Sequence, residues 1–194
     1  MLGAGLSERM GGYPKPLIKF KGKYFVEYIY ENLISINAEK ILFVAGHKSE
    51  LVIKRLGFLD KIIFLINKDY KSGQFSSLKC GLEYIQNNKI DFDNIMISLS
   101  DTPFVKIDTY KKIIESIEKD KTIIPSYNFS AGHPVIIDKF LFDIMLNSPL
   151  TSVSKNIINS FKSKIKYVNV GDENIINDFD CRKLISGDDW EFEL

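Results

Sequence analysis

Short apolar runs rich in β-branched residues alternate along this chain with longer stretches of helical period. The run at 41–45, Ile-Leu-Phe-Val-Ala, is apolar throughout, as expected of a parallel strand that is buried on both faces. Three later runs have the same character, at 61–66, 94–99 and 121–125. Apolar residues at helical spacing occupy 24–36, 76–86 and 107–117. This alternation predicts a three-layer α/β sandwich, in which helices cover both faces of a mostly parallel sheet.

The second half of the chain continues the pattern less regularly. Residues 134–138 and 164–170 are expected strands, and 139–146 and 153–161 are expected helices. A length of 194 residues suits one well-buried domain, and no internal repeat or change of composition divides it. We therefore expect a single domain over 1–194. The acidic end of the chain, 186–194, carries the only tryptophan, Trp190, and is expected to be a loose tail.

The composition is that of an ordinary soluble globular protein, and it excludes several classes of function. The formal net charge is +1, with basic and acidic residues interspersed, so no nucleic-acid partner is expected. No apolar run approaches the roughly 18–20 residues that span a bilayer, and no secretion signal is evident. Two cysteines, Cys80 and Cys181, are too few for a disulfide framework. We expect a cytoplasmic protein with no membrane partner.

The glycine-rich segment at 2–11, Leu-Gly-Ala-Gly-Leu-Ser-Glu-Arg-Met-Gly, is the most informative part of the sequence. Small residues at 3–5 let backbone N–H groups approach phosphates with no side chain in the way. Arg9 offers a planar fork for phosphate oxygens, and Lys15 adds a point charge that can follow charge build-up during transfer. The segment matches neither the dinucleotide fingerprint GxGxxG nor the P-loop. The candidate phosphate-binding residues are Leu2, Gly3, Ala4, Gly5, Ser7, Arg9 and Lys15.

Almost nothing precedes this glycine-rich segment. A phosphate-binding loop of an α/β fold is normally fed by a β-strand, yet only Met1 and Leu2 stand before Gly3. Losing a central strand would leave both neighbouring strands with unpaired backbone groups, which is costly when they are buried. We therefore expect a first strand that is truncated.

Acidic residues supply a candidate metal site. Asp101 closely follows the expected strand at 94–99, which places its carboxylate at the carboxyl end of the sheet, where open α/β folds bind ligands. Mg2+ binds through one or two carboxylates and through substrate phosphates. Asp101 and Asp180 could form such a pair, with Asp178 as a third candidate. The alternative is that Asp101, which precedes Thr-Pro, only makes a turn or caps a helix.

At these residues the chain resembles the MobA-like NTP transferase family, and within it the cytidylyltransferase branch that acts on the molybdenum cofactor. The opening segment is similar to the family signature L-A-(A/G)-G-x-S-x-R-M-G, and a lysine follows at Lys15. Segment 67–82 resembles the family's G-x-x-x-S-L-x-x-G-L, and 98–105 resembles its D-x-P motif. Residues 132–135, Gly-His-Pro-Val, match the cytidylyl-type segment, and Asp-Phe-Asp at 178–180 matches the late D-x-D. The matches cover nearly the whole chain.

The resemblance implies a single-domain, Rossmann-like fold of the GT-A type and a nucleotidyl-transfer reaction. A terminal phosphate of molybdopterin would attack the α-phosphorus of a nucleoside triphosphate and release pyrophosphate. The backbone at 3–5 would cradle phosphates, Arg9, Lys15 and Asp101 would be catalytic, and Mg2+ would bind Asp101 with Asp180. No nucleophilic Ser, Cys or His is implied.

The resemblance also implies binding roles for three further residues. It places Ser76 and Ser77 against the base and ribose of the nucleotide, and His133 near the second substrate. From the residues alone, the two serines are explained equally well as caps of a helix N-terminus. His133 is explained equally well as a loop residue without a role.

The identity of the base rests on one position of the loop. In the family, guanylyl enzymes tend to read L-A-G-G and cytidylyl enzymes L-A-A-G, and this chain has Ala4 at the discriminating position. An added methyl group there leaves less room for a purine, so we expect CTP rather than GTP. A molybdopterin-type acceptor is then expected, with a molybdoenzyme or chaperone as a transient partner.

Two departures from the family pattern keep other functions open. Gly3 replaces an alanine, which is expected to be harmless or to loosen the loop, and Cys-Arg-Lys at 181–183 replaces Thr-Pro-Glu. One alternative is a nucleotidyltransferase that uses GTP or acts on a sugar phosphate or another phosphorylated alcohol. A second is a non-catalytic nucleotide-binding homologue. A nicotinamide dehydrogenase is the weakest, because Glu39 is not a convincing ribose ligand.

Overall fold

The computed structural model describes residues 1–179 and 189–192. Its helices are α1 (Phe25–Ser35), α2 (Ser49–Leu56), α3 (Gln74–Asn87), α4 (Ile107–Glu115), α5 (Lys139–Asn147) and α6 (Ser154–Asn159). Its strands are β1 (Leu2–Gly3), β2 (Lys19–Phe20), β3 (Lys23–Tyr24), β4 (Ile41–Ala45), β5 (Ile62–Ile66), β6 (Asn94–Ile97), β7 (Thr122–Tyr127), β8 (Ser130–Ala131), β9 (Val135–Asp138), β10 (Ile165–Asn169) and β11 (Trp190–Glu191). Every element expected from the sequence is present, with ends that agree to about two residues. The sequence did not predict α2 or the short strands β2, β3 and β8.

The strands form the mostly parallel sheet that the sequence predicts. On one side β1, β4 and β5 pair in parallel, and on the other β6, β9, β7 and β10 follow one another. β9 runs antiparallel to both β6 and β7, whereas β10 and β7 are parallel. The two halves meet at Leu2, which pairs with Val44 and also bridges Leu99. β1 therefore lies in the middle of the sheet, although it is only two residues long.

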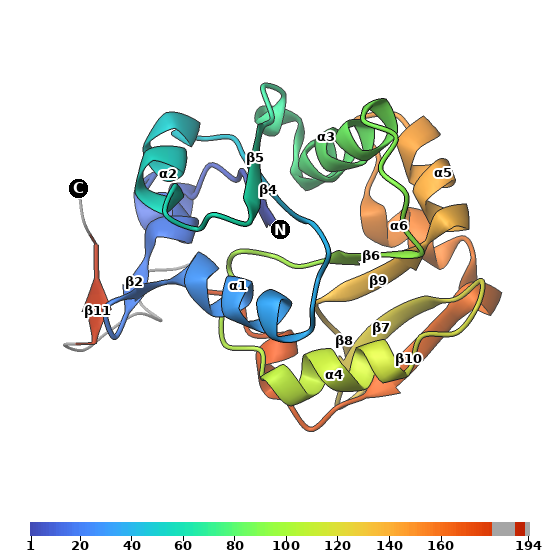
Figure 1. Ribbon diagram of the computed structural model, residues 1–194. Helices are drawn as coiled ribbons and strands as arrows, with labels where there is room; N and C mark the ends of the chain where they lie inside the picture. Colours follow the sequence, from blue (N-terminus) through green and yellow to red (C-terminus); the bar gives the residue numbers. More distant parts are fainter. Residues whose placement is uncertain (180–188, 193–194) are drawn as a thin grey trace.

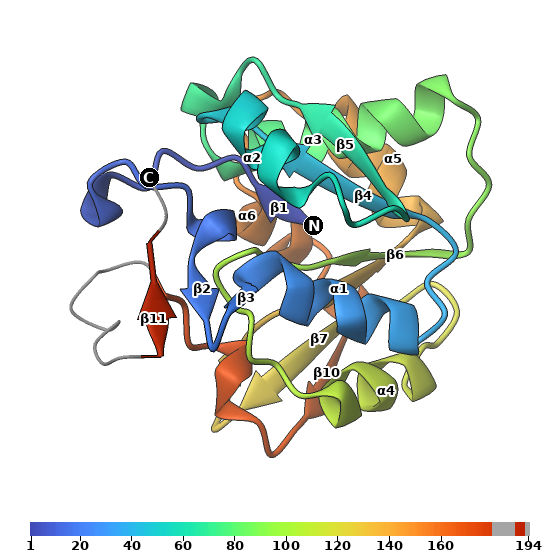
Figure 2. The same ribbon diagram turned by 60° about the vertical axis from the view of Figure 1, so that its left-hand side comes forward.

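Helices cover both faces of the sheet, as Figures 1 and 2 show. Helices α1, α2 and α4 bury apolar residues in one core cluster, and α3 and α5 bury theirs in a second, with α6 packed against it. Alternate residues of the strands serve the two clusters: Ile136 of β9 belongs to the first, and Val135 and Ile137 belong to the second. The three-layer, Rossmann-like arrangement in one domain is confirmed.

The last described residues form a strand rather than a loose tail. Trp190 and Glu191 of β11 pair antiparallel with Phe20 and Lys19 of β2, in a small sheet beside α1 (Figure 1). The Trp190 ring lies 4.6 Å from the ring of Phe20, centroid to centroid. The expectation of a loose tail is wrong for 189–192, because the indole buries its surface on an aromatic cluster. Residues 186–188 and 193–194 lie outside the described part.

No helix in the described part of the chain is long and apolar enough to cross a membrane.

Candidate active site

A cavity of about 570 Å3 opens at the carboxyl ends of β1 and β6, beside the turn that joins β5 to α3. Parallel strands of an open α/β sheet present their following loops at this edge, which is where such folds bind ligands. The lining residues come from the glycine-rich loop, the start of α3 and the loop after β6: Leu2, Gly3, Ala4, Gly5, Leu6, Ser7, Glu8, Arg9, Lys15, Pro16, Tyr70, Lys71, Gly73, Gln74, Ser77, Leu99, Ser100, Asp101 and Asp178. Most of the predicted site residues therefore share one cavity.

The glycine-rich loop leaves β1 and is held in place from two sides. Ser7 adopts a left-handed conformation (φ 54°) and precedes the short 3-10 helix Glu8–Met10. Gly12, also at positive φ, offers its carbonyl oxygen to the ring of His47, 3.2 Å away. His47 follows β4, so it fixes the far end of the loop rather than lining the cavity.

Gly3 is required by its neighbours in this structure. A Cβ atom built on Gly3 would lie 2.4 Å from the Phe43 ring and 2.8 Å from the Pro16 ring. Phe43 is fully buried, so its ring has little room to move. The glycine was expected to be harmless or to loosen the loop. Instead it allows the start of the loop to pack against a large core side chain.

Ala4 is 3% exposed, and its methyl group packs toward Gly46 and Tyr70. A Cβ on Gly46 would lie 2.7 Å from the Ala4 Cβ. The methyl group is thus largely enclosed by the loop after β4, although Ala4 belongs to the cavity wall.

Lys15 and Asp101 form an ion pair at the mouth of the cavity. Lys15 Nζ lies 2.8 Å from Asp101 Oδ2, and the two side chains are 19% and 21% exposed. Lys15 begins a 3-10 helix after the glycine-rich loop, and Asp101 follows β6. The second carboxylate oxygen, Oδ1, is buried without a hydrogen-bond partner among the described residues. Buried carboxylate oxygens normally have a hydrogen-bond partner, so this atom is free to accept a further contact.

The backbone N–H of Phe179 donates to the Asp101 carbonyl at 2.9 Å. This bond brings Asp178, an exposed residue, into the wall of the same cavity. Asp180, the predicted partner in metal binding, lies outside the described residues. Within 1–179 and 189–192, no group of three or more His, Cys, Asp or Glu side chains could hold a metal ion. One or two carboxylates that act together with substrate phosphates still suit Mg2+.

The two serines at the start of α3 have different surroundings. Ser76 is 1% exposed, and its hydroxyl lies within hydrogen-bonding distance of the carbonyl oxygens of Asp69 (2.9 Å) and Gly73 (2.7 Å), to either of which it can donate its one hydrogen. Asn67 Nδ2 donates to both serine hydroxyls, at 2.9 and 3.1 Å. Only Ser77 reaches the cavity wall. Ser76 therefore serves the turn that starts α3, and Ser77 is the one that faces the cavity.

His133 is turned away from the cavity. Its Nδ1 lies 3.2 Å from the Ile97 carbonyl oxygen, and its ring does not belong to the cavity wall. Burial lowers the pKa of His133, against the opposing effects of the Ile97 carbonyl and the Asp101 charge. The peptide bond from His133 to Pro134 is cis. The neutral imidazole thus supports the segment behind Asp101.

Several lining residues were not singled out from the sequence. Asn67 does not line the cavity, but it directly follows β5 and donates to both serine hydroxyls, so its position at a strand end was a usable signal. Tyr70 and Gln74 carry no such signal, because they reach the cavity only through the turn before α3. Glu39, the acidic residue weighed for a dehydrogenase, precedes β4 and lies at the opposite edge of the sheet.

The fold and the cavity define a nucleotide-dependent transferase, in which a small-residue loop, a cation and a carboxylate meet at the carboxyl edge of a parallel sheet. The comparison with known families identifies it more closely. Residues 1–163 match the family model described as MobA-like NTP transferase domain. The chain belongs to this family and is a nucleotidyltransferase.

Individual relatives carry different activities in their names. The molybdenum cofactor cytidylyltransferase of Escherichia coli is 26% identical over 136 residues, which are 70% of this chain and 67% of the relative. The nicotine blue oxidoreductase of Paenarthrobacter nicotinovorans is 26% identical over 145 residues, 71% of this chain and 69% of the relative. The bifunctional protein GlmU of Nitrosomonas europaea is 24% identical over 172 residues; they are 88% of this chain but only 36% of that protein.

Among solved structures, a nucleotidyl transferase from Methanothermobacter thermautotroptrophicus has a TM-score of 0.76 and 16% identity. The alignment covers 94% of this chain and 90% of that chain. At this identity the likeness establishes the fold and leaves the substrates open.

Proposed function

We propose that this protein transfers CMP from CTP to molybdopterin and releases pyrophosphate. The observation that carries the proposal is the Lys15–Asp101 ion pair. Its Nζ and Oδ2 atoms lie 2.8 Å apart, in the cavity that the glycine-rich loop lines. The similarity to the molybdenum cofactor cytidylyltransferase, which extends over 70% of the chain, supports this choice of substrates. A transient molybdoenzyme or chaperone partner stays a prediction.

In the proposed reaction, a phosphate oxygen of molybdopterin attacks the α-phosphorus of CTP. The bond from that phosphorus to the bridging oxygen breaks, and its electron pair leaves with pyrophosphate. Such transfers need in-line positioning and compensation of negative charge more than covalent help from the protein. The backbone N–H groups at 3–5 would face the phosphates, and Arg9 and Lys15 would offset their charge.

Asp101 fits the role of a metal ligand because its Oδ1 is buried and without a partner in the described chain. The second carboxylate would be Asp180, as the sequence predicts, or Asp178, which lines the same cavity. Mg2+ held there would offset the charge that builds up on the phosphates during transfer. Lys15 would exchange its contact with Asp101 for one with the triphosphate.

Ser77 and Gln74 at the start of α3 would contact the nucleoside. Both line the cavity, at a helix N-terminus where backbone N–H groups favour oxygen acceptors. Ala4 supports CTP over GTP by its similarity to the cytidylyl type of loop. Because the Ala4 methyl group is enclosed, it would not touch the base, and the preference for CTP would come from the position of the loop backbone.

The test is Mg2+-dependent release of pyrophosphate with CTP, GTP, ATP and UTP, each with molybdopterin, with a sugar 1-phosphate, or with no acceptor. Release that requires CTP and molybdopterin, and that Asp101→Ala abolishes, is the expected result. Glu118→Gln is a matched control, because Glu118 pairs with Lys166 at 3.0 Å on the surface.

Two other outcomes would replace the proposal. Release with a sugar 1-phosphate alone would assign the chain to the nucleotidyltransferases that act on sugar phosphates, such as the putative glucose-1-phosphate thymidylyltransferase from Bacillus anthracis, whose fold is similar. Nucleotide binding without release from any combination would favour the non-catalytic homologue.

A further inference from the structure

A cluster of aromatic rings packs beside the segments that carry the candidate metal ligands, and the proposed reaction does not use it. The rings come from β2, α1, the loop after β6, the segment after β10, and β11, and they are those of Phe20, Phe25, Phe104, Phe179 and Trp190. Centroids of contacting rings lie 4.6–6.1 Å apart. None of these five residues belongs to the wall of the active-site cavity.

Two members of the aromatic cluster are close in sequence to the candidate metal ligands. Phe104 follows Asp101 by three residues, and Phe179 stands between Asp178 and Asp180. Bonded neighbours are only about 3.8 Å apart, from Cα to Cα, so the place of Phe179 limits the place of either carboxylate. The rings of Phe104 and Phe179 lie 5.1 Å apart at an interplanar angle of 90°. The cluster therefore joins the Asp101 loop to the segment of the second carboxylate.

The beginning of that segment is held by polar contacts outside the aromatic cluster. Asp172 is 3% exposed, and its Oδ2 accepts from the Lys106 N–H at 2.8 Å and from the Thr109 hydroxyl at 2.9 Å, at the start of α4. The Ile175 carbonyl accepts from the His133 N–H at 2.9 Å. The carboxylate-bearing end of the segment, three residues later, has different supports.

The far end of the segment is supported by Phe179 and, through it, by Trp190. The Phe179 ring lies 5.6 Å from the Phe25 ring and 5.6 Å from the Trp190 ring. Trp190 also contacts Phe104, at 6.1 Å. β11 holds the indole in place, because Trp190 pairs with Phe20 of β2 (Figure 2). The indole thus contacts the rings that adjoin both candidate metal ligands.

We propose that Trp190 is a positioning residue for the metal site. Its ring holds the phenylalanines of the two segments together and so sets the spacing between the Asp101 carboxylate and the second carboxylate beside Phe179. The inference rests on the proposed function, in which these carboxylates hold Mg2+. That ion demands near-ideal octahedral geometry, and contacts behind the ligands orient them. The Asp101 Oδ1 that would meet the cation is buried and has no partner in the described chain.

The experiment measures Mn2+ binding to the full chain by water-proton relaxation, for Mn2+ alone and with each of CTP, GTP, ATP and UTP. The variants are Trp190→Leu, Phe179→Leu, the double variant with both changes, and Trp190→Phe. Phe140→Leu is the matched control, because Phe140 packs on the Phe161 ring at 5.1 Å and belongs neither to the aromatic cluster nor to the cavity wall. Each protein is measured well below its own Tm.

We expect Trp190→Leu and Phe179→Leu each to weaken Mn2+ binding about tenfold, as removal of a contact that orients a metal ligand does. The double variant should lose little more than either single variant, because both changes break the same contact. Trp190→Phe retains a ring and should recover most of the affinity, and Phe140→Leu should bind Mn2+ as the unchanged chain does.

Equal Mn2+ affinities for Trp190→Leu and the unchanged chain would overturn this inference and leave the proposed function standing. An equal loss in Phe140→Leu would also overturn it, because metal affinity would then only follow the stability of the fold. If the unchanged chain bound Mn2+ under none of these conditions, the proposed function and this inference would both be wrong.

Discussion

Lys15 and Asp101 are 86 residues apart in the sequence, yet Lys15 Nζ donates to Asp101 Oδ2 across 2.8 Å. The pair joins the segment after the glycine-rich loop to the end of β6. It leaves the other carboxylate oxygen of Asp101 buried and without a partner in the described chain. The contact holds a cation and a carboxylate together before either meets a charged substrate.

Removal of either member should reduce transfer without a large effect on stability. We expect Lys15→Met and Asp101→Asn each to lower kcat/KM by roughly 10^2–10^3, the usual loss when one charge-stabilising group is removed. The double variant should lose less than the product of the two, because the groups act on the same phosphates. Steady-state kinetics with a Lys166→Met control check this, and additive losses would show that the residues act separately.

Gly3 and Phe43 form a size-matched pair. Gly3→Ala should lower the free energy of unfolding by about 1–3 kcal/mol, because the new methyl group meets the Phe43 ring. Phe43→Leu shortens that side chain, so the double variant should be more stable than the sum of the single changes predicts. Urea unfolding measures all three. Gly5→Ala is the control, since a Cβ on Gly5 meets nothing within 4 Å. Strict additivity would mean that the loop moves away from the ring instead.

Substitution of Ser76 should affect mainly the stability of the fold, and substitution of Ser77 should affect mainly the binding of the nucleotide. Ser76→Ala removes a buried hydroxyl that donates to a backbone carbonyl oxygen and accepts from Asn67, so the free energy of unfolding should fall by about 1–3 kcal/mol with KM for the nucleotide little changed. Ser77→Ala removes a group from the cavity wall and should mainly raise that KM, several-fold. Urea unfolding and nucleotide titrations give the two readouts. The opposite pattern would place Ser76 at the ligand.

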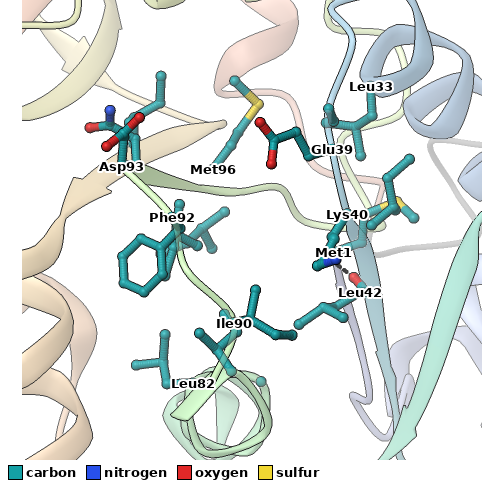
Figure 3. Close-up of a pocket in the computed structure, with 18 of the residues that line it drawn as sticks. Met1, Leu33, Glu39, Lys40, Leu42, Leu82, Ile90, Phe92, Asp93 and Met96 are labelled. Atoms are coloured by element: carbon teal, nitrogen blue, oxygen red, sulfur yellow. Dashed lines mark hydrogen bonds between the residues drawn. The ribbon is translucent and has the colours of Figure 1, made fainter. Parts of the chain in front are cut away.

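The stability of the chain that starts at Met1 should fall as the pH is lowered from 8 toward 5. Burial lowers the pKa of the Met1 amino group from 8.0 to about 5, so between these values the unfolded chain binds the proton and the folded chain does not. The stabilisation is fully present above pH 8 and is lost on acidification, by up to about 4 kcal/mol. Met1 lines a cavity of about 530 Å3 (Figure 3), and the charged side chains in the wall of that cavity are Glu39, Lys40, Asp91 and Asp93.

The buried His133 should also make the folded chain less stable on acidification, but at lower pH. Its pKa is lowered by burial, so its contribution is lost only below its ordinary value of 6.5. Unfolding free energies at pH 8.0 and 6.5 therefore isolate the amine, with an expected loss of roughly 2 kcal/mol. Acetylation of the amino terminus should remove this dependence of the unfolding free energy on pH. If the dependence survives acetylation, another titratable group is responsible for it.

The sequence predicted the elements because their signals are local. Apolar runs such as 41–45 and helical spacing such as that of 107–117 depend only on neighbours along the chain. The glycine-rich loop and Asp101 were predictable for the same reason, since each lies within a few residues of the end of a strand. The sequence analysis missed α2. It also did not predict the packing of Trp190, because the aromatic partners of this residue, Phe20, Phe25 and Phe104, are distant in sequence.

The sequence by itself determined the order of strands and helices, the family, and the residues that can meet phosphates. Only the tertiary structure decided that Lys15 pairs with Asp101, and that Asn67 joins two serines of which one faces the cavity. These relationships depend on which strands become neighbours and in what register. That choice is made by the burial of both faces of the sheet together, and so no local stretch of the sequence contains it.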